Sequence, residues 1–177
     1  MKEEYTLVVV DMQPDFAASR HPLTLNAVER EVRAARRRGC PVVVLQIPYF
    51  SPRDEVGYRP THERIMRHLA SYRRKQVVEK LQSDGSYQVI VTCARNGFTL
   101  ERFRVCGVNT DICVLKSVQG LSETLPACRI TVVADACNSS YEPDCLPVFR
   151  FFDNVAVELP AGPSARKARA GKSPRKQ

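Results

Sequence analysis

The stretch Arg104-Val-Cys-Gly-Val-Asn-Thr-Asp-Ile-Cys-Val114 combines a short apolar run, a glycine and a polar turn. The apolar run is typical of a buried strand, and residues 110–120 fit a helix that follows it directly. Cys113 would then lie in the first turn of that helix, where unpaired backbone N–H groups and the helix dipole favour negative charge. A thiol there is expected to have a lowered pKa and to act as a nucleophile. The alternative is that Cys113 is a small buried packing residue.

Two charged residues follow apolar runs elsewhere in the chain. Asp11 ends the predicted strand Tyr5–Val10, and Lys80 ends the run Gln76-Val-Val-Glu-Lys80. Sites of open α/β sheets form outside the carboxyl ends of the strands, so both side chains are expected near Cys113. Their chemistry is complementary: Lys80 can hold a carboxylate and a thiolate charged, while Asp11 can take the thiol proton and later give it to a leaving amine.

Three motifs of the chain occur together in one known family. They are Val8-Val-Val-Asp-Met-Gln-Pro-Asp-Phe16, then Val-Glu-Lys80, then Cys106-Gly-Val-Asn-Thr-Asp-Ile-Cys113. In this order they resemble the isochorismatase-like cysteine hydrolases, which include nicotinamidases and N-carbamoyl amidohydrolases. The resemblance extends over about residues 5–158.

The resemblance implies a role for each motif residue. Asp11, Lys80 and Cys113 would form the catalytic triad. A non-proline cis peptide of this family falls on Val108-Asn109 here. It would direct the N–H groups of Asn109 and Cys113 to one point, as an oxyanion hole.

Substrate-binding residues are expected after the first and second strands. Gln13 could hydrogen-bond a substrate amide and Phe16 could stack on a planar group, as similar family positions do. Tyr49 belongs to the long, proline-rich loop 48–60, and loops of this kind usually cover or line a site. The chain departs from the family at Pro14 and after Lys80, which leaves the substrate open.

No metal ion or other cofactor is predicted. Relatives of the nicotinamidase type carry an Asp-x-His metal motif near residues 53–55, where this chain has Arg-Asp-Glu. His62 and His68 are six residues apart, which is not the same-face spacing of a two-histidine site. Both are interpreted as surface histidines.

The remaining pattern predicts an α/β protein. Residues 24–38 have the apolar periodicity of an amphipathic helix that stops at Gly39. Further strands are expected at 41–47, 103–106, 129–134 and 154–159, and further helices at 61–72, after Ser83 and Asp84, and around 145–152. The resemblance implies a three-layer α/β/α fold with a six-stranded, mostly parallel sheet in the order 3-2-1-4-5-6.

Charge divides the chain into a domain, residues 1–160, and a basic tail, residues 161–177. The net charge is +8, yet six basic residues lie in the tail, which leaves 21 basic and 19 acidic residues before it. The tail lacks apolar periodicity and is predicted to be disordered, with weak polyanion contact as one possible role. The seven cysteines without an N-terminal apolar segment favour a reducing cytoplasm, and no stretch is long enough to span a membrane.

These observations predict a cysteine-dependent amidohydrolase. It would cleave a C–N bond of a small amide or carbamoyl compound through a thioester intermediate. The alternative is a non-catalytic or regulatory binding protein of the same fold. A nucleic-acid-associated role through the tail is a third class, and a homo-oligomer is expected by resemblance.

Overall fold

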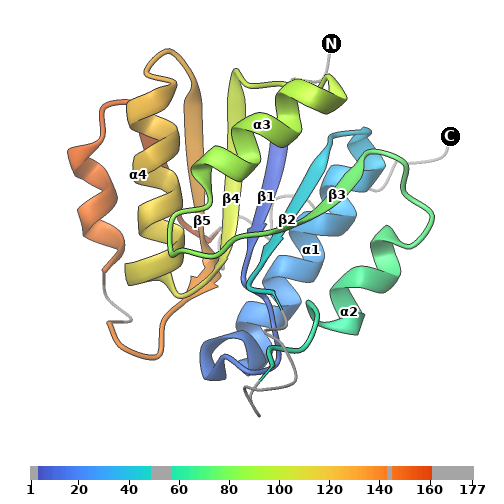
Figure 1. The fold of residues 1–177 in the computed structure, drawn as a ribbon. Helices are drawn as coiled ribbons and strands as arrows, with labels where there is room; N and C mark the ends of the chain where they lie inside the picture. Colours follow the sequence, from blue (N-terminus) through green and yellow to red (C-terminus); the bar gives the residue numbers. More distant parts are fainter. Residues whose placement is uncertain (1–3, 49–56, 143–144, 161–177) are drawn as a thin grey trace, which may run out of the picture.

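A single sheet of six parallel strands forms the centre of the protein (Figure 1). The computed structural model describes residues 4–48, 57–142 and 145–160. The strand order is β3-β2-β1-β4-β5-β6. The strands are β1 (Thr6–Val10), β2 (Val42–Gln46), β3 (Lys75–Glu79), β4 (Arg102–Val108), β5 (Arg129–Asn138) and β6 (Val155–Glu158). The predicted fold class and strand order are confirmed.

Helices cover both faces of this sheet and make it a three-layer structure. On one face lies α1 (Pro22–Arg38), with the short α2 (Glu63–Met66) beside it, while α3 (Ser86–Asn96) and α4 (Leu115–Thr124) lie on the other. Strand β1 shows why two layers are needed. Leu7 and Val9 belong to the core beneath α1, whereas Val8 and Val10 belong to the core beneath α3 and α4.

Several predicted helices differ from the observed ones. The segment predicted as one helix at 61–72 is a single α-turn, α2, followed by the 3₁₀ turn η2 (Arg67–Leu69). The segment after Cys145 is the 3₁₀ helix η4 (Leu146–Phe151), which has Pro147 in its first turn. Because neither segment is longer than two turns, tertiary packing and not intrinsic propensity sets its conformation.

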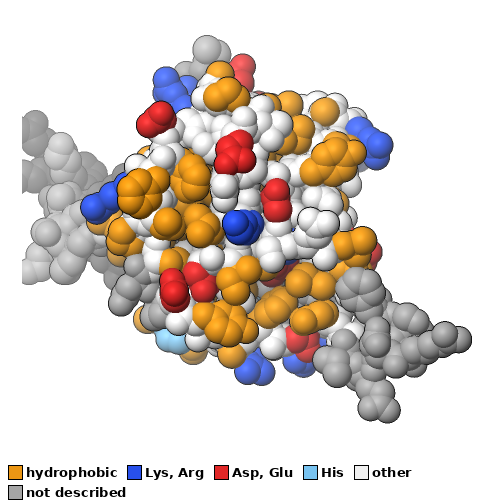
Figure 2. All heavy atoms as spheres, turned by 60° about the vertical axis from the view of Figure 1, so that its left-hand side comes forward, with side chains coloured by type: hydrophobic (Ala, Val, Ile, Leu, Met, Phe, Trp, Pro, Cys, Tyr) orange, Lys and Arg blue, Asp and Glu red, His pale blue; other side chains and the backbone are white. Residues whose placement is uncertain are grey.

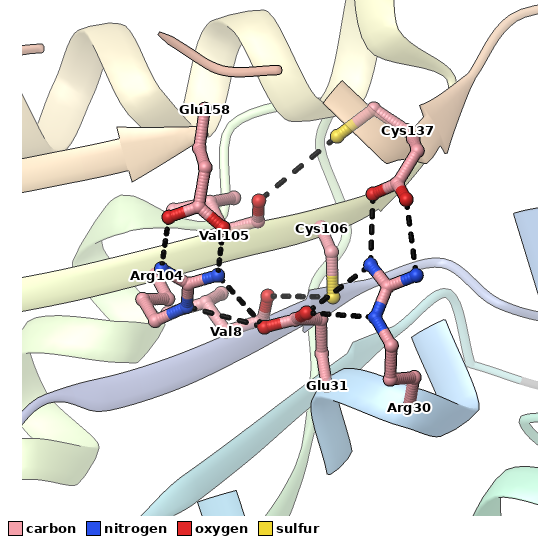
Figure 3. A network of polar contacts seen from close by, with 9 residues as sticks. Val8, Arg30, Glu31, Arg104, Val105, Cys106, Cys137 and Glu158 are labelled. Carbon is pink, nitrogen blue, oxygen red and sulfur yellow. Dashed lines mark hydrogen bonds and ion pairs between the residues drawn. The ribbon is translucent and has the colours of Figure 1, made fainter. Parts of the chain in front are cut away.

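An ionic network ties α1 to three strands (Figure 3). The Arg104 guanidinium of β4 donates to Glu31 of α1 at 2.9 Å and to Glu158 of β6 at 2.8 Å. Arg30 of α1 donates to both carboxylate oxygens of Asp135 at 2.9 and 3.0 Å. Asp135 of β5 is thus a structural hydrogen-bond acceptor for α1.

Cysteines pack among the strands beside this ionic network. All seven cysteines are free thiols. Cys106 and Cys137 have their sulfur atoms 3.7 and 4.0 Å from the carbonyl oxygens of Val8 and Val105 (Figure 3). These thiols fill space between strands and donate weakly to main-chain oxygens.

Figure 2 shows the face formed by α4 and η4, on which hydrophobic side chains gather among charged ones. A hollow of about 510 Å³ lies here, and its lining includes Leu115, Val148 and Phe151. The Phe151 side chain is 84% exposed.

No described helix is long and apolar enough to cross a membrane. The homo-oligomer stays a prediction, and the tail at 161–177 lies outside the described residues.

Candidate active site

Three elements bring Asp11, Lys80 and Cys113 together at the carboxyl edge of the sheet. Asp11 follows β1, Lys80 follows β3, and Cys113 lies in the π-helix η3 (Thr110–Val114) that follows β4. The Lys80 ammonium nitrogen is 2.8 Å from Asp11 Oδ2, and both side chains are at most 1% exposed. The Cys113 thiol interacts with both charged groups. A buried acid, a buried ammonium and a thiol therefore share one site.

Asp11 is held in an unusual backbone conformation. Its φ of 48° lies in the left-handed region, which non-glycine residues seldom adopt. Its N–H donates to the carbonyl oxygen of Leu45 at 3.0 Å, and its own carbonyl accepts from the Gln13 N–H at 2.7 Å. These bonds fix the turn that directs the carboxylate inward.

The environment of Asp11 favours proton exchange. Burial raises the pKa of the Asp11 carboxyl group above its usual value, and the nearby Lys80 ammonium offsets only part of this rise. The carboxylate interacts with the Lys80 ammonium and with the Cys113 thiol. Such a carboxylate is available to accept a proton from a neighbouring thiol.

Lys80 follows β3 and Asp11 follows β1, so the Lys80 side chain spans the position of β2, the strand that lies between them in the sheet. Its ammonium also donates to the carbonyl oxygen of Gln82 at 3.0 Å. Gly85 makes room for its aliphatic stem, because a Cβ there would lie 3.0 Å from Lys80 Cδ and 2.5 Å from Leu45 Cδ1. The Gly85 N–H donates to Ser117 Oγ of α4 at 2.9 Å. Gly85 and Ser117 thus support the site, and no local sequence signal marked either of them.

Cys113 corrects one prediction. The sequence predicts a lowered pKa for this thiol, but burial and the negative charge of Asp11 raise it to about 11. Lys80 acts in the opposite direction and does not compensate. Cys113 is only 8% exposed, and the desolvation of its thiolate outweighs the effect of the helix N-terminus. A thiol with this pKa would need a base in order to act as a nucleophile at neutral pH.

The turn before Cys113 requires close backbone contacts. Gly107 has φ 128°, and a Cβ there would lie 2.0 Å from the carbonyl oxygen of Val10. The peptide bond Val108-Asn109 is cis. The Asn109 carbonyl then accepts from the N–H groups of Ile112 and Val114 at 3.2 and 3.0 Å, which opens the helix as a π-turn.

A second contact braces this turn from β5. Ser139 Oγ hydrogen-bonds Asp111 Oδ1, and the N–H groups of Tyr141 and Glu142 donate to the same hydroxyl at 3.0 and 3.3 Å. The Ser140 N–H is 3.4 Å from Asn109 Oδ1. The segment after β5 thereby fixes the nucleophile turn, which sequence reasoning missed because the two segments are about 30 residues apart.

Gln13 is buried, and its amide group is fully occupied by the main chain. Its nitrogen donates to the carbonyl oxygens of Ile47 and Arg59 at 2.9 and 2.8 Å. Its oxygen accepts from the Ile47 N–H at 2.8 Å. The side chain therefore joins the end of β2 to the segment at residue 59.

We expect Gln13→Ala to lower the free energy of unfolding by about 1–3 kcal/mol, because it leaves the half-buried Ile47 N–H without its acceptor. Urea unfolding followed by circular dichroism measures the change. Gln119→Ala is the control, since Gln119 hydrogen-bonds Glu123 in an exposed position on α4 and its loss should change stability by less than about 0.5 kcal/mol. Equal effects of the two variants would contradict the tethering role.

The aromatic residues expected to bind substrate are partly described. Phe16 is half-buried and stacks on Tyr58, with the ring centroids 5.3 Å apart. Asp15 beside it accepts from the Arg59 N–H at 2.7 Å. Tyr49 lies outside the described residues. Phe16, which is five residues after Asp11, therefore packs on residue Tyr58, next to the Arg59 carbonyl that Gln13 binds.

His62 and His68, predicted as surface histidines, are half-buried and have hydrogen-bond partners. His62 Nε2 is 3.0 Å from Ser19 Oγ, and His68 Nε2 is 2.6 Å from Glu29 Oε1. Within residues 4–48, 57–142 and 145–160, no group of three or more His, Cys, Asp or Glu side chains is arranged to hold a metal ion.

The sequence and the fold were compared with those of known proteins. The model of the isochorismatase domain family matches residues 5–145. No curated protein matches the sequence. Three similar solved structures share 16–21% of their residues with this chain. The N-carbamoylsarcosine amidase of Thermoplasma acidophilum has 21% identity and a TM-score of 0.69, over 89% of this chain and 96% of that one.

The two other structures are a nicotinamidase and a ribonuclease. The nicotinamidase of Staphylococcus aureus has 16% identity and a TM-score of 0.73, over 89% of this chain and 98% of that one. The MAR1 ribonuclease of Caenorhabditis elegans has 20% identity and a TM-score of 0.68, over 87% and 76%. At these identities the likeness establishes a common fold.

Proposed function

This chain belongs to the isochorismatase domain family, and from that premise we propose that it is a cysteine-dependent hydrolase of small amide or carbamoyl C–N bonds. The observation that carries the proposal is the buried Asp11–Lys80 ion pair beside the Cys113 thiol. A buried ion pair contributes little net stability to a fold. Its position beside a thiol therefore favours a role in chemistry over a role in stability.

The reaction begins with the attack of Cys113 on the substrate carbonyl carbon. Asp11 accepts the thiol proton as the S–C bond forms, because a thiol with a pKa of about 11 is not ionised on its own at neutral pH. We assign the N–H groups of Asn109 and Cys113 to the oxyanion of the tetrahedral intermediate. The π-turn η3, which follows Asn109 and contains Cys113, supports this assignment.

Breakdown of the intermediate returns the proton. Asp11 donates it to the leaving nitrogen, the C–N bond breaks, and ammonia or an amine leaves a thioester on Cys113. Water then attacks the thioester carbon while Asp11 takes one of its protons. The C–S bond breaks, the carboxylic acid or carbamic acid is released, and Asp11 reprotonates the sulfur. Lys80 favours the ionised form of Asp11 between these transfers, because its ammonium offsets part of the effect of burial.

Substrate recognition falls to the segments near residues 13–16 and 47–60. We propose that the Phe16 ring, stacked on Tyr58, forms an apolar wall against a small planar substrate. Gln13 acts by holding that wall, because its amide is already occupied. Tyr49 remains a proposed contact on the basis of sequence. The cytoplasmic location also remains a proposal, supported by the seven free thiols.

The direct test is ammonia release from a panel of small amides, carbamoyl compounds and nicotinamide. Hydrolysis of any member establishes the reaction class and defines the acyl part and the leaving group. The alternative, a non-catalytic binding protein, predicts that compounds of the panel bind, as measured by calorimetry, without release of ammonia. That result would overturn the proposed activity.

We expect kcat/KM to decline on the acid side with an apparent pKa above that of an ordinary carboxyl group. Burial raises the pKa of Asp11, and only the ionised carboxylate can take the thiol proton, so activity rises as pH increases through this raised value. The pH profile of the best panel substrate measures it. Asp15→Asn, which changes an exposed carboxylate of the same loop, should leave the profile unchanged. An acid limb that moves with Asp15 would contradict the assignment.

A further inference from the structure

A second hollow lies at the opposite edge of the sheet from Cys113. It has a volume of about 440 Å³ and is lined at the amino ends of β1, β4 and β5. This edge is at the top of Figure 1, near the N-terminus. The lining residues are Glu4, Tyr5, Arg38, Arg102, Phe103, Arg104, Arg129 and Thr131. Half of them are arginines, which is unusual for a cavity between strands and a helix end.

Strand register explains why these side chains meet. Arg102 pairs with Arg129 and Arg104 pairs with Thr131, so these four side chains point to the same face of the sheet. Tyr5 precedes the pair Thr6–Phe103 by one residue and thus lies beside Arg102. Arg102 and Arg129 thus place two like charges on neighbouring strands, beside the hollow.

The helix on this face ends before it covers the hollow. Helix α1 ends at Arg38, and Gly39 then turns the chain back toward β2. Arg38 is therefore placed over the edge of the hollow and not over the apolar core. Its guanidinium carbon is 5.9 Å from the centre of the Tyr5 ring, and that of Arg104 is 5.7 Å from it.

Charge in this hollow is only partly neutralised. Arg104 is paired with Glu31 and Glu158, and Glu4 is paired with Arg74. For Arg38 and Arg129, by contrast, no ion pair with a carboxylate is found in the described part of the chain. The hollow therefore has an excess of positive charge with guanidinium donors available at its rim.

The Tyr5 hydroxyl is an independent sign of an incomplete site. Tyr5 is 6% exposed, and its Oη is buried without a hydrogen-bond partner of good geometry among the described residues. Arg38 acts on this group electrostatically and as a hydrogen-bond donor, which leaves the hydroxyl proton without an acceptor among the described residues. A buried hydroxyl proton without an acceptor carries a desolvation cost, which a bound oxygen acceptor would relieve.

We propose that this arginine hollow binds a small polyphosphate, free or as part of a nucleotide. Guanidinium groups match phosphate oxygens in charge and in fork geometry. The arginines extend over neighbouring strands about 4.8 Å apart, which favours an anion longer than one phosphate. The volume of about 440 Å³ holds a small molecule and not a folded partner. This binding is separate from the hydrolysis at Cys113.

Calorimetry of the full chain with tripolyphosphate at low salt tests the proposal. Binding should weaken at least about tenfold in the double variant Arg38→Gln/Arg129→Gln, because each lost charge-assisted hydrogen bond contributes about that factor. Tyr5→Phe should weaken it by a smaller factor while leaving the charge unchanged. Citrate, a polycarboxylate of similar size, should bind more weakly than tripolyphosphate.

The basic tail is the main competing source of polyanion binding. The double variant Arg166→Gln/Arg169→Gln removes the same charge from the tail and should change the affinity by less than about twofold. Loss of binding in the tail variant alone, or no binding of tripolyphosphate to the intact chain, would overturn the proposal. So would a preference for an RNA oligonucleotide that the Arg38→Gln/Arg129→Gln variant does not alter, which would assign nucleic-acid binding to another surface. None of these results depends on hydrolytic activity.

Discussion

Cys113→Ala should lower kcat/KM for the best amide substrate by a factor of about 10³ or more, because no other group in the site can form the thioester. The change removes one sulfur atom from a side chain that is 8% exposed, and we expect the fold to be retained. The ammonia-release assay measures the rate, and circular dichroism checks the fold. Trapping of the thioester by mass spectrometry after acid quench should succeed in the intact protein and fail in the variant.

Cys40→Ala is the matched control for this substitution. Cys40 is also a buried free thiol, but it lies between α1 and β2 at the edge of the sheet away from Asp11. It should keep full activity while losing some stability through a small cavity. Substantial hydrolysis by Cys113→Ala would exclude the covalent mechanism and favour direct attack of a water molecule.

Lys80→Met is expected to have the second large effect, on stability and activity together. It leaves the Asp11 carboxylate buried without a counter-charge, which should cost about 3–5 kcal/mol of unfolding free energy. The pKa of Asp11 should rise further, because burial then acts without the offsetting ammonium. The loss of stability should therefore be largest at high pH and fade at low pH, where Asp11 is protonated. Urea unfolding at several pH values measures this.

A double variant separates the two effects of Lys80. Asp11→Leu/Lys80→Met removes both buried charges and should recover most of the stability, while hydrolysis stays abolished. Lys116→Met changes an exposed lysine on α4 and should alter stability by less than about 0.5 kcal/mol. If Lys80→Met were as stable as the unchanged protein at neutral pH, the charged pair in the resting site would be disproved.

The buried pair gives a reason for the raised pKa of the Cys113 thiol in the proposed mechanism. A permanently ionised thiolate would leave two negative charges against one ammonium in a buried site. With the proton on sulfur, the net charge of Asp11, Lys80 and Cys113 is zero until substrate arrives. Charge then develops on the substrate oxygen, where the proposed oxyanion hole can stabilise it.

Much of the fold could be read from the chain alone, because local pattern is enough for it. The run Tyr5–Val10 and the run at 41–47 are apolar on both faces, which only a strand covered on two sides requires. The periodicity from residue 24 to Arg38 and the stop at Gly39 define α1 to its last residue. Short segments such as 61–72 were not predictable in detail, since their conformation depends on packing.

Of the candidate site, the sequence by itself determined which residues follow the strands, and hence that Asp11, Lys80 and Cys113 meet at one edge. Parallel strands have their carboxyl ends on the same side, so chain order sufficed. Only the tertiary structure decided that burial raises the Cys113 pKa, that the Gln13 amide is occupied, and that arginines gather around Tyr5. Desolvation, hydrogen-bond partners and cross-strand register depend on residues distant in the chain, and no local pattern contains them.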